Sequence, residues 1–265
     1  MSFQDKVAWI TGASSGIGEA LALELARRGA RLVLSARREG ELQRVADATR
    51  LPSDRIMILP LDVTDETSIP ALVAAVLVRF GRIDYVFQNA GITQRSFVND
   101  TNFAVYRRLM EVNFFGVVAL TQAVLPVMLG QKSGHFVVTS SVSGKIGVKQ
   151  RSGYCASKHA LHGFFDSLRA EVASDGLHVT LVCPGYIRTP ISKSALDATG
   201  GAYGRSDKHQ EQGMAVEVFA HKLITAVVSQ REEVYIGGRE LIGVYLKRFF
   251  PRLLSRILRN RAVEA

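Results

Sequence analysis

Tyr154 and Lys158 lie four residues apart in the stretch SGYCASKHALHGFF, residues 152–165. On a helix this spacing places both side chains on one face, one turn apart. A free tyrosine has a pKa near 10 and is a poor base at neutral pH, but a nearby ammonium favours the phenolate. The two side chains could therefore act as a general acid and base. The same spacing is common by chance on ordinary helices, so other residues must decide.

Two serines, Ser140 and Ser141, end a predicted strand thirteen residues before the tyrosine. Ligands of open α/β sheets bind at the carboxyl ends of the strands. A hydroxyl there could hold a substrate oxygen beside Tyr154. Side chains alternate along a strand, so we expect only one of the two serines to face the site.

A third candidate is Asn113, in the stretch MEVNFFG within a predicted long helix. Asparagine is a poor residue for a helix interior, so its presence there calls for a reason. The alternative is an asparagine on the helix surface. We interpret His159 and His162, in the helix of Tyr154, as packing or surface residues, and Cys155 as a small packing residue.

A glycine-rich turn joins a strand to a helix in VAWITGASSGIGEALALELA, residues 7–26. In a Rossmann unit such glycines permit a tight turn, close approach of a pyrophosphate and packing of the helix on the sheet. The helix N-terminus then directs free N–H groups at the phosphates. The alternative is a turn that only packs the helix. The residues expected to contact a nucleotide here are Gly12, Ser14, Ser15, Gly16, Ile17 and Gly18.

The end of the second predicted strand, VLSARRE, favours one dinucleotide over the other. An acidic side chain at this point binds the ribose 2′-hydroxyl of NAD. Here Ala36 takes that place, and Arg37 and Arg38 follow. Guanidinium groups bind a 2′-phosphate, which a carboxylate would repel. We therefore predict NADP(H) as the cofactor, with Arg37 as the main contact. The alternative is a solvated arginine pair at the start of a helix.

Short apolar runs and helix-period segments alternate along most of the chain. Continuous apolar runs are typical of strands buried on both faces, and the alternation predicts an α/β Rossmann fold, a doubly wound parallel sheet with helices on both faces. Two of the predicted helices, 16–29 and 68–81, end in glycine. The predicted strands are 6–10, 31–36, 55–60, 83–88, 134–140, 177–183 and 232–237.

The spacing T-G-x-x-x-G-x-G, which begins at Thr11, resembles that of the short-chain dehydrogenase/reductase family. The resemblance extends over about residues 5–237 and implies one domain with a seven-stranded sheet in the order 3-2-1-4-5-6-7. It is closest to an NADP(H)-preferring, hydroxysteroid-dehydrogenase-like branch. The residues that match the four catalytic positions of the family, in order, are Asn113, Ser141, Tyr154 and Lys158.

The resemblance implies a role for each of these residues. Tyr154 exchanges a proton with the substrate oxygen, and Ser141, rather than Ser140, orients that oxygen. Lys158 sets the acidity of the tyrosine and binds the nicotinamide ribose. Asn113 supports a water linked to the lysine. The implied reaction is hydride transfer between nicotinamide and a carbonyl or secondary alcohol, where the cofactor supplies the hydride chemistry.

Three further stretches resemble cofactor contacts of the family. In LPLDVTD, Asp62 matches an adenine contact, although it could equally cap the next helix. In QNAG, Gln88 departs from the usual asparagine. PGYIRTP, residues 184–190, matches a turn near the nicotinamide. The additional expected contacts are Asp62, Val63, Asn89, Ala90, Gly91, Pro184, Gly185, Ile187 and Thr189.

Composition is that of one sizeable globular domain: 265 residues, of which 47% are hydrophobic. Two cysteines predict neither a disulfide framework nor a metal site and favour the cytoplasm. We find no leader and no run of about 18 apolar residues, so we expect no membrane-spanning helix. The net charge is +9, of which the tail 239–265 contributes +5, with seven basic and two acidic residues. The body is only mildly basic, which argues against a nucleic-acid partner.

Two segments depart from the strand–helix alternation. We expect the polar, Gly-rich segment 190–213 to be a substrate-binding lid on a catalytic domain of residues 1–238. The extension 239–265 is basic and amphipathic, and Pro251 predicts one helix ending near Phe249 and another beginning at the proline. Such a segment can lie at a membrane interface or cover a subunit. The predicted location is the cytoplasm, with possible contact at the inner face of a membrane.

The resemblance and the tail together favour a lipophilic substrate, such as a steroid-, retinoid- or fatty-acyl-like carbonyl. The family also implies a homodimer or homotetramer, in which the helices of Asn113 and Tyr154 meet. The alternative function is a non-catalytic NADP(H)-binding redox sensor or scaffold. Proteins of that kind commonly lack the Tyr/Lys pair, which is intact here.

Overall fold

The computed structural model describes residues 3–205 and 207–260, and its centre is one parallel seven-stranded sheet. The strand order is β3-β2-β1-β4-β5-β6-β7, which confirms the predicted topology. All six strand pairings are parallel, with Ile10 of β1 opposite Leu34 of β2 and Phe87 of β4. The strands are β1 (Val7–Thr11), β2 (Arg31–Ser35), β3 (Ile56–Ile58), β4 (Tyr85–Gln88), β5 (Gly134–Thr139), β6 (Leu177–Pro184) and β7 (Glu233–Ile236).

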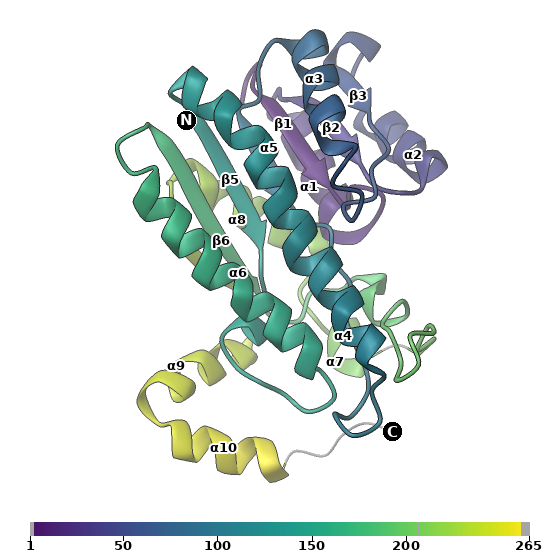
Figure 1. Ribbon diagram of the computed structural model, residues 1–265, viewed down its shortest axis with the longest axis vertical. Helices are drawn as coiled ribbons and strands as arrows, with labels where there is room; N and C mark the ends of the chain where they lie inside the picture. Colours follow the sequence, from purple (N-terminus) through teal and green to yellow (C-terminus); the bar gives the residue numbers. More distant parts are fainter. Residues whose placement is uncertain (1–2, 206, 261–265) are drawn as a thin grey trace.

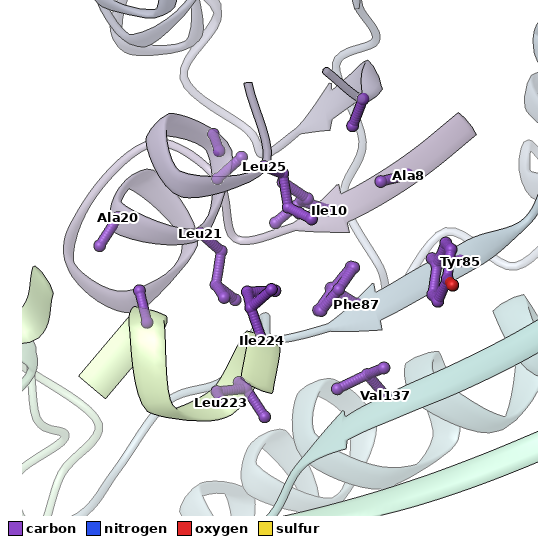
Figure 2. Close-up of a cluster of buried hydrophobic side chains, with 14 of the residues drawn as sticks. Ala8, Ile10, Ala20, Leu21, Leu25, Tyr85, Phe87, Val137, Leu223 and Ile224 are labelled. Atoms are coloured by element: carbon purple, nitrogen blue, oxygen red, sulfur yellow. The ribbon is translucent and has the colours of Figure 1, made fainter. Parts of the chain in front are cut away.

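Helices cover both faces of the sheet (Figure 1). On one face, α1 and α8 pack together over β1 and β4, and their apolar side chains meet those of the strands (Figure 2). On the other face, α3, α5 and α6 bury a second apolar layer. The helices of these layers are α1 (Gly16–Arg27), α2 (Glu39–Thr49), α3 (Ile69–Phe80), α4 (Phe103–Met110), α5 (Gly116–Gln131), α6 (Ser152–Glu171) and α8 (Val216–Val228).

The strands are buried on both sides, as their continuous apolar runs predicted. Trp9 and Ile10 are neighbours on β1, yet both are fully buried because they point into the two opposite layers. Helix α3 ends at Gly81, which adopts φ +74° as a left-handed cap. Helix α1 ends at Arg27, and Gly29, at φ +78°, follows its C-terminal cap.

One continuous helical run, Phe103–Gln131, corrects the expectation that no segment is long and apolar enough to cross a membrane. By length and composition alone this run meets that test, and 44% of its most apolar 18-residue window is buried inside the protein. The run comprises α4, the π-helical turn η2 (Glu111–Phe115) and α5. Its buried side contributes Leu120, Val124 and Met128 to the core. A core helix of an α/β protein needs such apolar residues, which accounts for the composition.

The tail forms two helices, α9 (Ile242–Phe249) and α10 (Pro251–Asn260), with the break at the predicted position. A short helical turn, η5 (Arg239–Leu241), precedes them. In Figure 1 the two helices form an arm, in yellow, beyond the end of α6. Leu254 of α10 is buried against Val142 and Ile146, which follow β5. The tail is therefore packed on the domain at the edge where β5 ends.

The segment predicted to be a lid is irregular, with two short helical turns. These are η4 (Pro190–Ser192) and α7 (Lys208–Glu211). Isolated bridges join Leu196 to Gln94 and to Ala202, and Met214 to Ile187. These pairings hold the segment beside the loop that follows β4.

Candidate active site

A cavity of about 1150 Å³ lies at the carboxyl ends of the central strands. Residues that follow β1, β2, β4, β5 and β6 line it, together with the segment 190–213 and the tail. It exceeds the roughly 300–1000 Å³ of most small-molecule sites, so it has room for a large ligand or for two ligands. Its position is where ligands of doubly wound sheets bind.

The glycine turn between β1 and α1 has the backbone shape that a phosphate needs. Gly12 and Gly16 adopt φ values of +65° and +59°, which favour glycine. A Cβ on Gly12 would lie 2.9 Å from Ala90 Cα, so the two loops touch backbone to backbone. The N-cap residue Ser15 makes no side-chain hydrogen bond to the first turn of α1. The N-terminus of the helix therefore keeps N–H donors for an anion, and the turn fits a dinucleotide pyrophosphate.

Gly18 differs from the other predicted contacts in this turn. It does not line the cavity, whereas Gly12, Ser14, Ser15, Gly16 and Ile17 do. A Cβ on Gly18 would lie 2.2 Å from the carbonyl oxygen of Gly12. Gly18 thus packs against the backbone of the turn, and its role as a direct contact stays a prediction.

Arg37 and Arg38, after β2, both line the cavity and both are exposed. Arg38 Nη2 donates to Ser14 Oγ at 3.4 Å, which brings it to the glycine turn. Asp62 lies close by and accepts hydrogen bonds from the amide and hydroxyl of Thr64. Burial raises the pKa of Asp62, but the Thr64 bonds and the charges of Arg37 and Arg108 outweigh it and lower the pKa. Asp62 does not cap α3, which begins at Ile69, and Val63 also lines the cavity.

The end of β4 is tied to the glycine turn. Thr11 Oγ1 accepts hydrogen bonds from the amides of Asn89 and Ala90, each at 3.1 Å. The Asn89 side chain donates back to the carbonyl oxygens of Thr11 and Gly12. Gln88, the departure from the family pattern, is buried and donates to Thr121 Oγ1 at 2.6 Å. It therefore serves the packing of α5, while Asn89, Ala90 and Gly91 line the cavity.

Asn113 is completely buried within the π-helical turn, so it is not a helix-surface asparagine. Its Oδ1 accepts the amide of Ile92 at 2.8 Å, and its Nδ2 donates to the Ile92 carbonyl and to Ser157 Oγ. A Cβ on Gly91 would lie 3.2 Å from Asn113 Oδ1 and 3.5 Å from Lys158 Nζ. Asn113 therefore holds the loop after β4 beside the lysine. π-Helical turns such as the one that contains Asn113 are common at functional sites.

Ser140 and Ser141 point to different partners. Ser140 Oγ donates to the backbone carbonyl of Lys158 at 3.2 Å and lies 2.9 Å from His162 Nε2. Ser141 accepts the amide of Ser143 at 3.0 Å, and its side chain is also a hydrogen-bond partner of Tyr154. The alternation of side chains therefore places Ser141 beside the phenol, and Ser140 supports α6.

Tyr154 and Lys158 both line the cavity from the first turns of α6. Lys158 Nζ lies 5.9 Å from the centre of the Tyr154 ring and donates to the Thr139 carbonyl at 2.7 Å. Burial raises the pKa of Tyr154, while the bond to Ser141 and the charge of Arg151 oppose that rise. Burial lowers the pKa of Lys158 to about 8. Burial thus moves the two pKa values in opposite directions, so the ammonium of Lys158 loses its proton at a lower pH than the phenol of Tyr154.

The two histidines of α6 do not line the cavity. His159 is exposed, and its Nδ1 lies 2.7 Å from the Cys155 carbonyl. His162 is buried between Ser140 and Glu233 of β7, with Nδ1 3.4 Å from the carboxylate. It is therefore a packing residue with polar contacts, as predicted in outline. Cys155 is buried, and its pKa is raised by burial, which suits a packing role.

The predicted nicotinamide turn lines the opposite wall. Pro184, Gly185, Ile187 and Thr189 all face the cavity. Gln210 of α7 donates to the Ile187 carbonyl at 2.8 Å and to Thr189 Oγ1 at 3.1 Å, so the segment 190–213 is fastened to this turn.

A carboxylate from the tail, which was not predicted, completes the turn after β6. Glu240 Oε1 accepts the amides of Tyr186 and Gly238, at 2.8 and 2.9 Å. A Cβ on Gly185 would overlap the same oxygen, so a larger residue there would displace the Glu240 carboxylate from the turn. Apolar tail residues also line the cavity, namely Ile242, Leu246, Leu254, Ile257 and Leu258.

Three arginines in the cavity wall were also missed: Arg95, Arg108 and Arg151. They come from loops and a helix surface, where a basic residue carries no local signal of its role. Within residues 3–205 and 207–260, no group of three or more His, Cys, Asp or Glu side chains could hold a metal ion.

Comparison with known proteins places the chain in a large group of relatives. The family model described as short chain dehydrogenase matches residues 6–199. The Drosophila melanogaster dehydrogenase/reductase SDR family protein 7-like is 42% identical over 264 residues, which cover 98% of this chain and 81% of that protein. The human dehydrogenase/reductase SDR family member 7 is 42% identical over 253 residues, which cover 93% of this chain and 75% of that protein.

A solved structure agrees with this placement. The short chain dehydrogenase/reductase from Burkholderia phymatum, determined in complex with NAD, aligns with a TM-score of 0.85 at 26% identity. The alignment covers 100% of this chain and 99% of that protein. Fold, glycine turn and sequence similarity over nearly the whole length thus agree, and the chain belongs to the short-chain dehydrogenase/reductase family of oxidoreductases.

Proposed function

We propose that the protein is an NADP(H)-dependent oxidoreductase that interconverts a carbonyl and a secondary alcohol. The observation that carries the proposal is the meeting of Ser141, Tyr154 and Lys158 in one cavity with the glycine turn. Tyr154 and Lys158 come from α6 and Ser141 follows β5, so two elements that are separate in the chain bring them together. When bound, the nicotinamide supplies or accepts the hydride.

The chain's own groups handle the oxygen and the proton. Ser141 holds the substrate oxygen next to the phenol with which it already shares a hydrogen bond. In the direction of reduction, Tyr154 donates its proton to that oxygen. Lys158, fixed by the Thr139 carbonyl, binds the nicotinamide ribose and favours the phenolate that remains. Asn113 is a positioning residue, because it holds the Ile92 backbone beside Lys158.

The preference for NADP(H) is supported by the charge at the end of β2. Ala36 stands where an acid would bind a ribose hydroxyl, and Arg37, Arg38 and Arg108 line the same part of the cavity. Asp62 is the nearby acid, and it is held by Thr64. Guanidinium groups at this place suit the 2′-phosphate.

A lipophilic substrate is supported by the tail. The cavity wall on the side of α9 and α10 consists of isoleucine and leucine side chains. Pockets lined in this way bind molecules by burying apolar surface, at roughly 25 cal/mol per Å².

The tail also supports contact with a membrane surface. The tail exposes six large apolar residues, of which Ile242 and Ile257 also line the cavity, among arginines and a lysine, a composition typical of helices that lie at a lipid interface. The proposed location is accordingly the cytoplasm, with peripheral attachment to the inner face of a membrane. The exposed apolar residues are Ile242, Tyr245, Phe249, Phe250, Leu253 and Ile257.

Self-association through the helices of Asn113 and Tyr154, as a homodimer or homotetramer, is a further part of the proposal. More than half of the most apolar window of Phe103–Gln131 is not buried within one chain, and Phe115 is 51% exposed. An apolar helix face of this extent is best covered by a second copy.

A panel of carbonyl compounds tests the proposal directly. We expect NADPH oxidation, followed at 340 nm, with aromatic ketones, steroid ketones and medium-chain 2-ketones. NADPH that binds tightly but is oxidised by none of these compounds would favour the second candidate, a non-catalytic sensor or scaffold. The intact Tyr154 and Lys158 argue against that candidate.

A further inference from the structure

Two arginines in the cavity wall share a single carboxylate oxygen. Arg95 Nη2 and Arg151 Nη2 lie 2.9 and 2.8 Å from the same Oδ2 of Asp207. Arg95 follows β4, Arg151 precedes α6, and Asp207 belongs to the segment 190–213. Both guanidinium groups line the cavity that also contains Tyr154. Two positive charges therefore have one negative charge between them.

This surplus charge is removed from solvent. The side chains of Arg95, Arg151 and Asp207 are only 8%, 17% and 14% exposed. Burial and the charge of Arg151 lower the pKa of Arg95, as expected for two cations held close together. A charge buried without a partner is strongly destabilising, so such groups are normally paired.

The nearby acids are already engaged. The other oxygen of Asp207, Oδ1, accepts the amides of His209 and Gln210. Among the described residues, the acids that line the cavity are Glu41, Asp62 and Glu240, which are held by Arg44, by Thr64 and by the turn after β6, respectively. Lys193 and Arg239 also line the cavity, and both are positive and exposed.

Hydrogen bonds hold in place the loop that carries Arg95 and the start of α6, which Arg151 precedes. Gln94 Oε1 accepts the amide of Gly153 at 2.9 Å, which fixes the loop after β4 to the start of α6. Arg95 Nη1 donates to the carbonyl of Gln94 at 2.9 Å. Arg151 uses Nη2 on Asp207, and a guanidinium carries five N–H donors, so its other nitrogens can serve a second acceptor.

We propose that Arg95 and Arg151 form an anion-binding subsite, which holds the carboxylate of an elongated apolar substrate. A carboxylate carries the one negative charge that the cluster lacks, and a guanidinium binds it in a two-pronged geometry. The apolar part of the ligand lies against the wall formed by Ile146, Val148, Leu196, Leu254 and Leu258. The inference rests on the proposed function for its reaction and narrows the substrate class to oxo-carboxylic acids.

Calorimetry on the cofactor-free protein tests the subsite without turnover. Decanoate and its methyl ester have the same apolar chain and differ in charge. We expect decanoate to bind at least roughly tenfold more tightly, the effect of one hydrogen-bonded ion pair. Arg151→Gln and, separately, Arg95→Gln should remove this difference, and Arg151→Lys should keep part of it. Asp207→Asn leaves an oxygen for the amides of His209 and Gln210. This variant should increase the difference in affinity between decanoate and its ester.

A matched control is Arg169→Gln. Arg169 lies near the C-terminal end of α6, the helix that Arg151 precedes. Its side chain is 21% exposed, pairs with Asp166 and does not line the cavity. This variant should keep the preference for decanoate. Equal binding of acid and ester by the unaltered protein would overturn the inference. A preference that survives both glutamine variants would overturn it as well.

Turnover separates this inference from the proposed function. The probes are 9-oxodecanoate, a methyl ketone whose reduction gives a secondary alcohol, and its methyl ester, with NADPH. The ratio of kcat/KM for acid over ester cancels any change that Arg151 causes in Tyr154 itself. A ratio above ten that falls toward one in Arg151→Gln supports the subsite. Equal turnover of both probes overturns the subsite and leaves the proposed function standing. Tight, arginine-dependent binding of decanoate with no turnover supports the subsite and contradicts the proposed function.

Discussion

Lys158 Nζ lies 5.9 Å from the centre of the Tyr154 ring and donates a 2.7 Å hydrogen bond to the backbone carbonyl of Thr139. The last residue of β5 thus anchors the ammonium while the phenol stands beside Ser141. The two residues are one turn apart on α6, but the sheet, and not the helix alone, fixes their relative position. This arrangement leads to five predictions.

Replacement of Tyr154 by phenylalanine removes the proton donor and leaves the ring. We expect turnover to fall by about 10³-fold or more. A positioned acid–base group accelerates a reaction by roughly 10²–10⁴-fold, and the phenylalanine ring has no hydroxyl to replace it. The dissociation constant of NADPH should stay within about twofold. Steady-state kinetics and a fluorescence titration measure the two quantities. Tyr106→Phe is the control, since Tyr106 contacts Ser152 of α6 but does not line the cavity. Substantial turnover by Tyr154→Phe would refute the assignment.

The neighbouring serines should respond in opposite ways. Ser141→Ala should lower kcat/KM by about 10²–10³, the loss typical of one oxyanion donor. Ser140→Ala should instead lower the free energy of unfolding by about 1–3 kcal/mol, because it leaves the buried His162 and the Lys158 carbonyl without their partner. Urea unfolding and kinetics on both variants distinguish the roles. The reverse pattern would identify Ser140 as the catalytic residue.

Arg37→Asp should reverse the charge at the cofactor's 2′-position. We expect the ratio of kcat/KM for NADPH over NADH to fall at least roughly tenfold, because the carboxylate repels a phosphate and can bind a ribose hydroxyl. Arg107→Asp changes the net charge equally, but Arg107 does not line the cavity, so this variant should keep the ratio. An unchanged ratio in Arg37→Asp would show that this arginine does not select the cofactor.

The buried lysine should make stability depend on pH in the cofactor-free protein. Its pKa is about 8 in the folded chain, against 10.5 for an ordinary lysine, because burial disfavours the ammonium. Between these values the unfolded chain holds a proton that the folded chain lacks, so stability rises with pH, by about 3 kcal/mol in all. Below pH 8 both states are protonated and the rise disappears.

The comparison that isolates this effect is the unaltered protein against Lys158→Met, by denaturant unfolding from pH 7 to 10.5. Across this range the unfolding free energy of the unaltered protein should rise relative to that of Lys158→Met. Tyrosines other than Tyr154 also titrate near its upper end, but they contribute equally to both proteins, and the double comparison with Tyr154→Phe removes the contribution of Tyr154. Parallel pH profiles would contradict a lowered pKa of Lys158.

The outer side of the tail should bind lipid surfaces. Phe249 and Phe250 are 68% and 62% exposed beside Arg248 and Arg252. We expect the protein to float with liposomes that contain anionic lipid, and Phe249→Ser with Phe250→Ser to reduce the bound fraction several-fold. The same double change at Phe97 and Phe103, also exposed, is the control. Loss of self-association without any effect on flotation would indicate that the tail covers a subunit instead.

Much of the fold was predictable because its signals are local. Each of the seven apolar runs became a strand, and Pro251 separates α9 from α10 because its ring cannot continue a helix. The long run Phe103–Gln131 was misjudged, since the polar residues that interrupt its apolar sequence do not interrupt the helix. A motif also marks a glycine without showing what surrounds it, and only the folded chain shows that Gly18 lies against the carbonyl of Gly12.

Residue type and spacing along the chain were enough to predict the parts of the candidate site: a glycine turn, an arginine pair after β2, and the order of Asn113, Ser141, Tyr154 and Lys158. These signals lie within one element or between successive elements. What surrounds these residues became known only from the folded chain. Folding placed tail leucines in the cavity wall and brought Arg95, Arg151 and Asp207 together from three distant segments. Such contacts join residues far apart in the chain, and the burial that gives them their effect exists only after folding.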